Sequence, residues 1–247
     1  MKSEKRNEVK AMAWLVALAG LLTVVSATGM SLFGGTFQPR PGSAYKNPIV
    51  EFELVLSAQE VFDVLLEPNS VEGKSIRFKM DRINYADYVF MVCYSGFIAC
   101  VFLFLGALNR SASRPIFSGN RFINIGLSLA VLMLLGDAVE NVQLLRLTNV
   151  SAVGEVESSV LNLLIIFTRI KWIALFASSL LLGLAYASYL GRSFGVIISF
   201  LYCIGGAIGL IAMIVPSARP LAEIGMPLMA IGWIATLGHA SVRAWQK

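Results

Sequence analysis

The sequence predicts an all-α integral membrane protein with six transmembrane helices. The chain is 57% hydrophobic and 14% charged, whereas a soluble globular domain carries about 25% charged residues. Its mean hydropathy is +0.73. Apolar runs of about 20 residues or more recur along the chain, and a helix of that length crosses the hydrocarbon core of a bilayer.

The predicted spans account for nearly all of the chain outside one polar segment. They cover residues 11–33, 88–108, 122–147, 160–190, 194–215 and 221–242. A basic stretch, residues 1–10, precedes the first run and also fits a secretory signal peptide. Because the apolar region of a signal peptide is usually only about 7–15 residues long, we favour an uncleaved first span. Residues 88–247 are then a single five-helix membrane domain.

The polar segment, residues 34–87, is expected to form a small outward-facing unit. Residues 49–56 partly alternate apolar and acidic side chains, which predicts a short strand. Ser57 and Glu60 have the spacing of a capping box, so a helix is expected to begin there. From Lys74 onward the apolar residues keep helical spacing, which predicts an amphipathic helix along the membrane surface or continuing into the second span.

The positive charges predict the orientation of the spans. Segments on the N-terminal side carry four, three, one and two Lys or Arg residues, and the two short loops on the other side carry one each, Arg146 and Arg219. Residues 34–87 hold six more, but long segments weigh less in the positive-inside rule. We therefore expect both termini in the cytoplasm and the polar segment outside, in a bacterial inner (plasma) membrane.

Several classes of site are excluded by composition. The three cysteines lie in apolar runs and indicate no disulfide framework. The single histidine, His239, excludes a His-rich metal site and a bis-His haem, and we expect it to be a satisfied interfacial side chain. No basic run interleaved with aromatics is present, so no nucleic-acid partner is expected. No catalytic motif was found, and no cofactor or metal is predicted.

One face of the third predicted span is polar. Asp137, Glu140 and Asn141 lie at i, i+3 and i+4, which places them together on a helix. Arg169 and Lys171 in the fourth run lie at a similar depth, about 15 Å from the outer end of their helix. An unpaired charge in the membrane costs on the order of 3 kcal/mol or more. These residues are therefore predicted to form a buried charge cluster.

Arg169 and Lys171 are two residues apart, so only one of them can face the acids squarely. Lys171 shares a face with Thr168 and Ser178 and is the favoured partner. Alternatively, both bases lie at the outer interface beside Trp172, and the first part of the fourth run lies flat or extends outward. Pairing two acids with two bases is nearly neutral, so a structural cluster and a ligand, ion or proton site both remain open.

Two further features complete the set of candidate residues. Asp87 lies at the outer mouth of the second span and is expected either to join the cluster or to complement the helix dipole. Gly205 and Gly209 form a small-xxx-small pattern, which favours close helix packing. Gly232 in the sixth span is the expected partner of that pattern.

The sequence favours a non-enzymatic multi-pass membrane protein. The absence of a catalytic motif and the compact size indicate a subunit, or a component that binds a partner or ligand around the charge cluster. One alternative is a small proton- or ion-coupled transporter, although no convincing inverted repeat relates the two halves. Another is a membrane-embedded lipid-modifying enzyme with Asp137 or Glu140 as general acid or base. Beyond the lipid bilayer, a membrane-protein partner or a homo-oligomer is expected.

Overall fold

The computed structural model describes residues 2–35, 40–111, 119–189 and 193–245. Within these ranges every regular element is helical, and six helices are long and apolar enough to cross a membrane. They are α1 (Lys2–Gly34), α4 (Val71–Ser111), α5 (Asn120–Leu147), α6 (Ser158–Tyr189), α7 (Ser193–Ile214) and α8 (Ala222–Trp245). The predicted all-α class is confirmed, and the six helices with the length and hydropathy of a membrane span match the predicted number. The loop positions Pro39, Arg114 and Arg192 and the terminal Lys247 lie outside the described residues.

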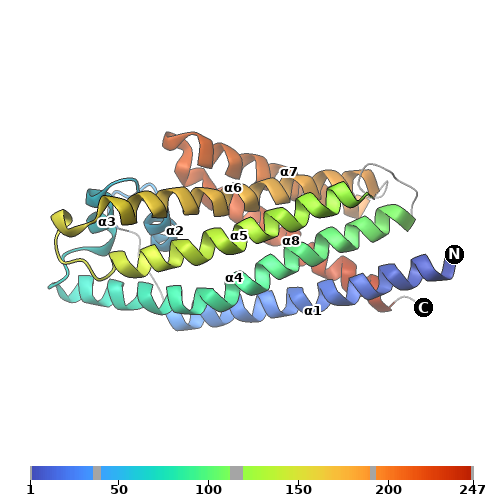
Figure 1. Ribbon diagram of the computed structural model, residues 1–247, viewed down its shortest axis with the longest axis horizontal. Helices are drawn as coiled ribbons and strands as arrows, with labels where there is room; N and C mark the ends of the chain where they lie inside the picture. Colours follow the sequence, from blue (N-terminus) through green and yellow to red (C-terminus); the bar gives the residue numbers. More distant parts are fainter. Residues whose placement is uncertain (1, 36–39, 112–118, 190–192, 246–247) are drawn as a thin grey trace.

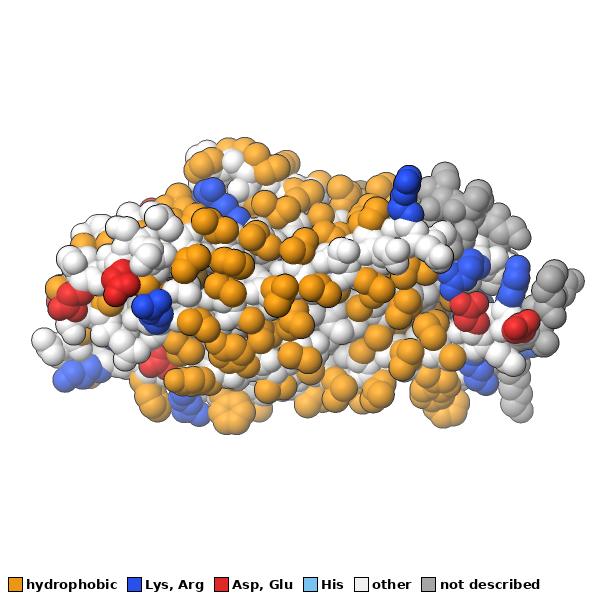
Figure 2. Space-filling model, in the orientation of Figure 1, with side chains coloured by type: hydrophobic (Ala, Val, Ile, Leu, Met, Phe, Trp, Pro, Cys, Tyr) orange, Lys and Arg blue, Asp and Glu red, His pale blue; other side chains and the backbone are white. Residues whose placement is uncertain are grey.

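The six long helices pack in a ring. α1 contacts α4, and successive contacts run through α5, α6, α7 and α8 back to α1. Both chain ends lie at one end of the bundle and the short helices α2 and α3 at the other (Figure 1). Figure 2 shows hydrophobic side chains over the middle of one face and charged side chains gathered toward the two ends. This distribution suits an integral membrane protein.

The short helices form a cap on one end of the bundle. The cap comprises α2 (Pro48–Glu53), α3 (Ala58–Leu65) and the 3-10 turn η1 (Val153–Glu155). Its apolar side chains form a second core with the nearby ends of α5 and α6, in which Phe52 and Leu65 meet Leu144 and Val160. Because this core joins the polar segment to the long helices, the cap has a fixed position on the bundle.

A buried arginine also fixes the cap. Arg77 on α4 is 8% exposed. It donates hydrogen bonds to the carbonyl oxygens of Thr148 at 2.7 Å, Val150 at 3.0 Å and Leu66 at 3.2 Å. These carbonyls follow the ends of α5 and α3. The guanidinium therefore satisfies acceptors that a helix end leaves without an intrahelical partner.

The strand predicted at residues 49–56 is wrong, because the chain forms helix α2 there. Asn47 caps this helix by accepting a hydrogen bond from the N–H of Ile49 at 3.0 Å, and Pro48 occupies the first helical turn. Both residue types are typical of a helix start. Glu51, which the alternation placed opposite the apolar side chains, is buried and pairs with Arg40 at 2.8 Å.

Two of the long helices begin well before the predicted spans, α1 at Lys2 instead of residue 11 and α4 at Val71 instead of residue 88. Ser57 caps α3 by accepting from the N–H of Glu60 at 3.1 Å, as the capping box predicted, while the Glu60 carboxylate reaches back to the N–H of Leu56 at 2.7 Å. The amphipathic stretch and the second span are one continuous helix of 41 residues, α4. The fourth run is likewise one helix, α6, so residues 160–170 do not form a separate segment.

Glycines bring α7 and α8 together. A Cβ atom on Gly205 would lie 3.0 Å from the carbonyl oxygen of Gly225, and one on Gly225 would lie 3.2 Å from the backbone nitrogen of Gly209. The partner of the predicted small-residue pattern is therefore Gly225. Gly232, the partner expected from the sequence, faces the ring of Tyr202 instead.

Candidate functional site

The centre of the site is the ammonium group of Lys171 on α6. Its Nζ lies 2.8 Å from Glu140 Oε1 and 3.2 Å from Asp137 Oδ1, both on α5. It also lies 3.2 Å from Glu53 Oε2 on α2. An ammonium has three N–H donors, and all three have a carboxylate partner here. We call these four residues the Lys171 cluster.

The local sequence explains how α5 and α6 come so close. Asp137 and Glu140 lie one turn apart and point to the same side of α5. Gly136 precedes them, and a Cβ atom there would lie 2.9 Å from the backbone nitrogen of Lys171 and 3.0 Å from the carbonyl oxygen of Phe167. The absence of a side chain at this position therefore lets the two backbones pack directly beside the cluster.

Aromatic side chains add hydrogen bonds to two of the three carboxylates of the cluster, while Glu140 Oε2 is buried without a hydrogen-bond partner among the described residues. The Tyr94 hydroxyl of α4 donates to Asp137 Oδ2 at 2.7 Å. The Trp172 indole N–H donates to Glu53 Oε2 at 3.1 Å, and its ring centroid lies 5.0 Å from the Lys171 ammonium. Both carboxylates are thus oriented by a neutral donor as well as by the lysine.

Burial affects the protonation of the one cluster residue outside the long helices. The pKa of Glu53 is raised above its ordinary value by burial and by the neighbouring Asp137 carboxylate, while Lys171 opposes this shift. Glu53 therefore favours its protonated form more strongly in the folded protein than in the unfolded chain.

The structure brings together only some of the candidate residues chosen from the sequence. Asp137, Glu140 and Lys171 lie together, whereas Arg169 is exposed on the other side of α6 and forms no ion pair within the described part of the chain. Asn141 is buried next to the cluster and donates from Nδ2 to Asp87 Oδ2 at 2.7 Å.

Sequence reasoning placed Tyr94 near Asp87 but assigned none of Glu53, Tyr94 and Trp172 to the cluster. Glu53 belonged to a segment that was interpreted as a strand outside the membrane, and 118 residues separate it from Lys171. Tyr94 lies seven residues after Asp87 on α4, so helical spacing alone could have placed both on one face. Trp172 entered only through the alternative that placed Arg169 and Lys171 at the outer interface.

The charge balance of the cluster differs from the predicted one, because Arg169 lies outside the cluster and Glu53 belongs to it. The sequence suggested two acids and two bases, which is nearly neutral. The structure surrounds one ammonium with three carboxylates, whose side chains are 3% exposed for Asp137, 0% for Glu140 and 15% for Glu53. The cluster therefore has a formal excess of negative charge in a largely buried setting.

A cavity of about 530 Å³ lies beside the cluster. Its wall includes residues of α1, α2, α4, α5, α6 and α8, among them Asp87, Asp137, Lys171 and Glu53. Volumes of about 300–1,000 Å³ are usual for small-molecule sites. The cavity is thus large enough for an organic ligand.

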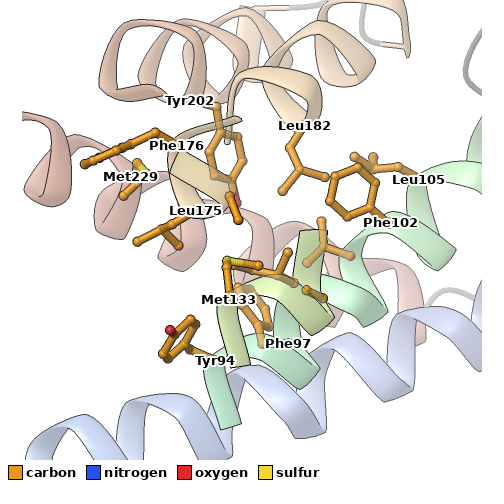
Figure 3. Packing of buried hydrophobic residues seen from close by; sticks show 14 of the residues in the cluster. Tyr94, Phe97, Phe102, Leu105, Met133, Leu175, Phe176, Leu182, Tyr202 and Met229 are labelled. Atoms are coloured by element: carbon orange, nitrogen blue, oxygen red, sulfur yellow. The ribbon is translucent and has the colours of Figure 1, made fainter. Parts of the chain in front are cut away.

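Two aromatic side chains of the cavity wall, Tyr94 and Trp233, belong to a group of packed rings. The rings of Tyr94 and Trp233 stack with centroids 6.2 Å apart, and Phe97 meets Trp233 edge-on at 5.9 Å. Figure 3 shows Tyr94 and Phe97 within the buried hydrophobic core, which also contains Met133 and Leu175. At the cap end, Glu223 of α8 accepts from the backbone N–H of Asn47 at 2.6 Å and so ties the polar segment to α8.

One buried side-chain nitrogen in the cavity wall has no hydrogen-bond partner among the described residues. Asn84 on α4 is 4% exposed, and its Nδ2 makes no hydrogen bond with any described residue. It lies one helical turn before Asp87. A buried amide without a partner costs about 1–3 kcal/mol, and a molecule in the cavity that bonds to it would remove that cost.

The described residues include no group of three or more His, Cys, Asp and Glu side chains arranged to hold a metal ion. Comparisons of the chain with models of protein families, with curated proteins and with solved structures find no match. Function is therefore inferred from the chemistry of the site itself.

Proposed function

We propose that this chain is a non-enzymatic membrane protein that binds a small ligand in the cavity beside the Lys171 cluster. The observation that carries the proposal is the surplus of carboxylates over ammonium groups beside a cavity of about 530 Å³. Buried ionisable groups in a membrane are costly, and by default they mark a functional site. A bound ligand would interact with the surplus negative charge, which the ion pairs with Lys171 alone do not balance.

The proposal includes an orientation. With both termini in the cytoplasm of a bacterial inner-membrane protein, the cap, which contributes Ile49, Val50 and Glu53 to the cavity wall, faces outward. The distribution of Lys and Arg along the sequence supports this arrangement. Ligand would then enter from outside the cell or from the outer leaflet. Fusion of a reporter enzyme that is active on only one side of the membrane to the C-terminus tests the orientation, and activity outside would contradict it.

The direct test is native mass spectrometry of the protein released from membranes in mild detergent. We expect a retained small molecule on the wild type that is lost in Asp137→Asn, since this substitution removes a cavity charge with little change of shape. Asp81→Asn is the matched control, because Asp81 on α4 bonds to Thr148 outside the cavity. A bare wild-type mass, or a molecule retained equally by both variants, would contradict the proposal.

The same measurement also addresses a partner protein. A second polypeptide in stoichiometric amount would make the chain a subunit, as the sequence also suggested. Contact of that polypeptide with residues 34–87 would then be mapped by cross-linking. A homo-oligomer would be recognised by its mass.

A proton- or ion-coupled transporter is the second candidate. The observation in its favour is again the charge surplus, because three carboxylates around one ammonium have capacity for a proton or a cation. In sealed vesicles with a pH-sensitive dye, Asp137→Asn should abolish coupled proton movement while the protein still folds. Collapse of expression in this variant would instead favour a structural ion pair. A lipid-modifying enzyme stays a third prediction and requires a product formed from added lipid by the pure protein.

A further inference from the structure

We propose that the ligand of this cavity is an organic cation. Its ammonium group binds at Asp87, and its apolar body lies against the aromatic side chains of the cavity wall. This inference rests on the proposed ligand-binding function and assigns the chemical class of its ligand.

The charge of the cavity wall favours a cation. Four carboxylates and two ammonium groups line it, a formal excess of two negative charges. Glu223 is already engaged with backbone N–H groups of the polar segment. An anion would have to enter against this excess, whereas a cation would neutralise part of it.

The carboxylate available to a ligand is that of Asp87. Asp137 bonds through both oxygens, to Lys171 and to Tyr94. Asp87 accepts a hydrogen bond from Asn141 to Oδ2 at 2.7 Å and is half-buried in the cavity wall. Its second oxygen can therefore accept from a ligand without displacing the Lys171 cluster.

Asn84 provides a second polar contact at the same place. It lies one turn from Asp87 on the same helix, lines the cavity and has a buried Nδ2 without a partner among the described residues. The two ends of an amide exchange by rotation about one bond. Asn84 can therefore donate to an oxygen beside the ligand's ammonium group or accept from its N–H.

The aromatic side chains of the wall suit the same charge. Phe90, Tyr94, Trp172 and Trp233 all line the cavity. The faces of such rings attract organic ammonium groups, and Trp is the most effective. The Lys171 ammonium beside the Trp172 ring already shows this contact within the protein.

The rest of the wall favours an organic cation over a hydrated metal ion. Met30, Leu175 and Met229 line the cavity and offer no oxygen ligands, which Ca²⁺ and Mg²⁺ require in number. An apolar body on the ligand would cover these side chains and remove their surface from water. A small apolar amine satisfies the carboxylate, the rings and the aliphatic wall together.

The test uses three probes of similar size and different charge: 2-phenylethylammonium, 2-phenylethanol and phenylacetate. Binding to the purified protein in lipid nanodiscs at pH 7 is measured by isothermal titration. We expect the ammonium compound to bind at least about tenfold more tightly than the alcohol, since a hydrogen bond to a charged group is worth about 10- to 100-fold in Kd. Phenylacetate should not bind.

Variants locate the bound cation. Asp87→Asn should weaken binding of 2-phenylethylammonium by about tenfold or more, while Asp87→Glu should retain most of it. Asp81→Asn on the same helix is the control and should bind like the wild type. Equal binding by Asp87→Asn and the wild type would overturn the placement of the ammonium group. The comparison of the three probes on the wild type remains decisive even where a variant fails to fold.

The outcomes separate this inference from the proposed function. Equal binding of the alcohol and the ammonium compound, or preferred binding of phenylacetate, overturns the cation but leaves a ligand-binding cavity. Binding of none of the three overturns both. Nanodiscs of phosphatidylglycerol alone are compared with nanodiscs that contain phosphatidylethanolamine. If the probe binds more weakly in nanodiscs that contain phosphatidylethanolamine, the lipid headgroup competes for the site and the natural ligand is a lipid amine. If the probe binds equally in both sets, the natural ligand is a free amine.

Discussion

Replacing Lys171 by Met is expected to destabilise the folded protein by about 3–5 kcal/mol, the usual cost of removing one partner of a buried ion pair. The structure places this change in the upper part of that range. Three carboxylates lie within 3.2 Å of the ammonium, and two of them, on Asp137 and Glu140, are at most 3% exposed. Water can therefore compensate little of the charge that remains.

The assay is unfolding by dodecyl sulfate titrated into maltoside micelles, followed by tryptophan fluorescence. Arg169→Met is the matched control, because Arg169 lies two residues away on α6 but is exposed. A substitution at such a surface site usually changes stability by no more than about 0.5 kcal/mol.

A double variant tests the cause of the loss. Adding Glu140→Gln to Lys171→Met removes one of the orphaned charges, so the double variant should be more stable than the sum of the two single losses predicts. Coupling of about 0.5–3 kcal/mol is usual for residues in contact. The reasoning would be refuted if Lys171→Met cost no more than Arg169→Met, because the ammonium would then contribute no more than an exposed charge.

Three further predictions concern single contacts. Tyr94→Phe removes the hydrogen bond to Asp137 and should cost about 1.5–3 kcal/mol in the same titration; an unchanged midpoint would contradict this. Gly209→Ala places a Cβ against the ring of Phe176 and should cost about 1–3 kcal/mol. In contrast, the Cβ of Gly96→Ala would meet no described atom within 4 Å outside its own helix backbone, so this change should be neutral or slightly stabilising. Because the pKa of Glu53 is raised in the folded state, its contribution to stability is present below the unfolded pKa and lost as pH rises through the folded one. Glu53→Gln should therefore become more stable relative to the wild type as pH rises, and titrations at several pH values showing a constant difference would refute it.

Local periodicity was sufficient to predict most of the membrane domain. Apolar runs longer than about 20 residues define the six long helices, since few other structures bury them. The i, i+3 spacing of Asp137 and Glu140 placed both acids on one face, and the polar neighbours of Lys171 separated it from Arg169. These inferences needed only the geometry of a single helix.

Features that depend on the closure of the ring could not be predicted in this way. Glu53 reaches Lys171 across 118 residues of sequence, and no pattern near either residue encodes that contact. The cavity has walls from six helices, so its volume follows from how they pack together. The error at α2 arose because alternation over so few residues suits a short helix as well as a strand, and the cap at Asn47 and Pro48 was the more specific signal.

The charge balance of the cluster distinguishes a structural role from a binding role. Neutralising Lys171 requires one carboxylate, and a buried ion pair of that kind is often no more stable than apolar residues of the same volume. The structure instead supplies three carboxylates to Lys171 and adds Asp87 in the cavity wall. Each additional acid makes the apo protein harder to fold in a membrane. Such a surplus is explained when the site is occupied by a positive charge from outside the chain, and this is the premise that the three probes test.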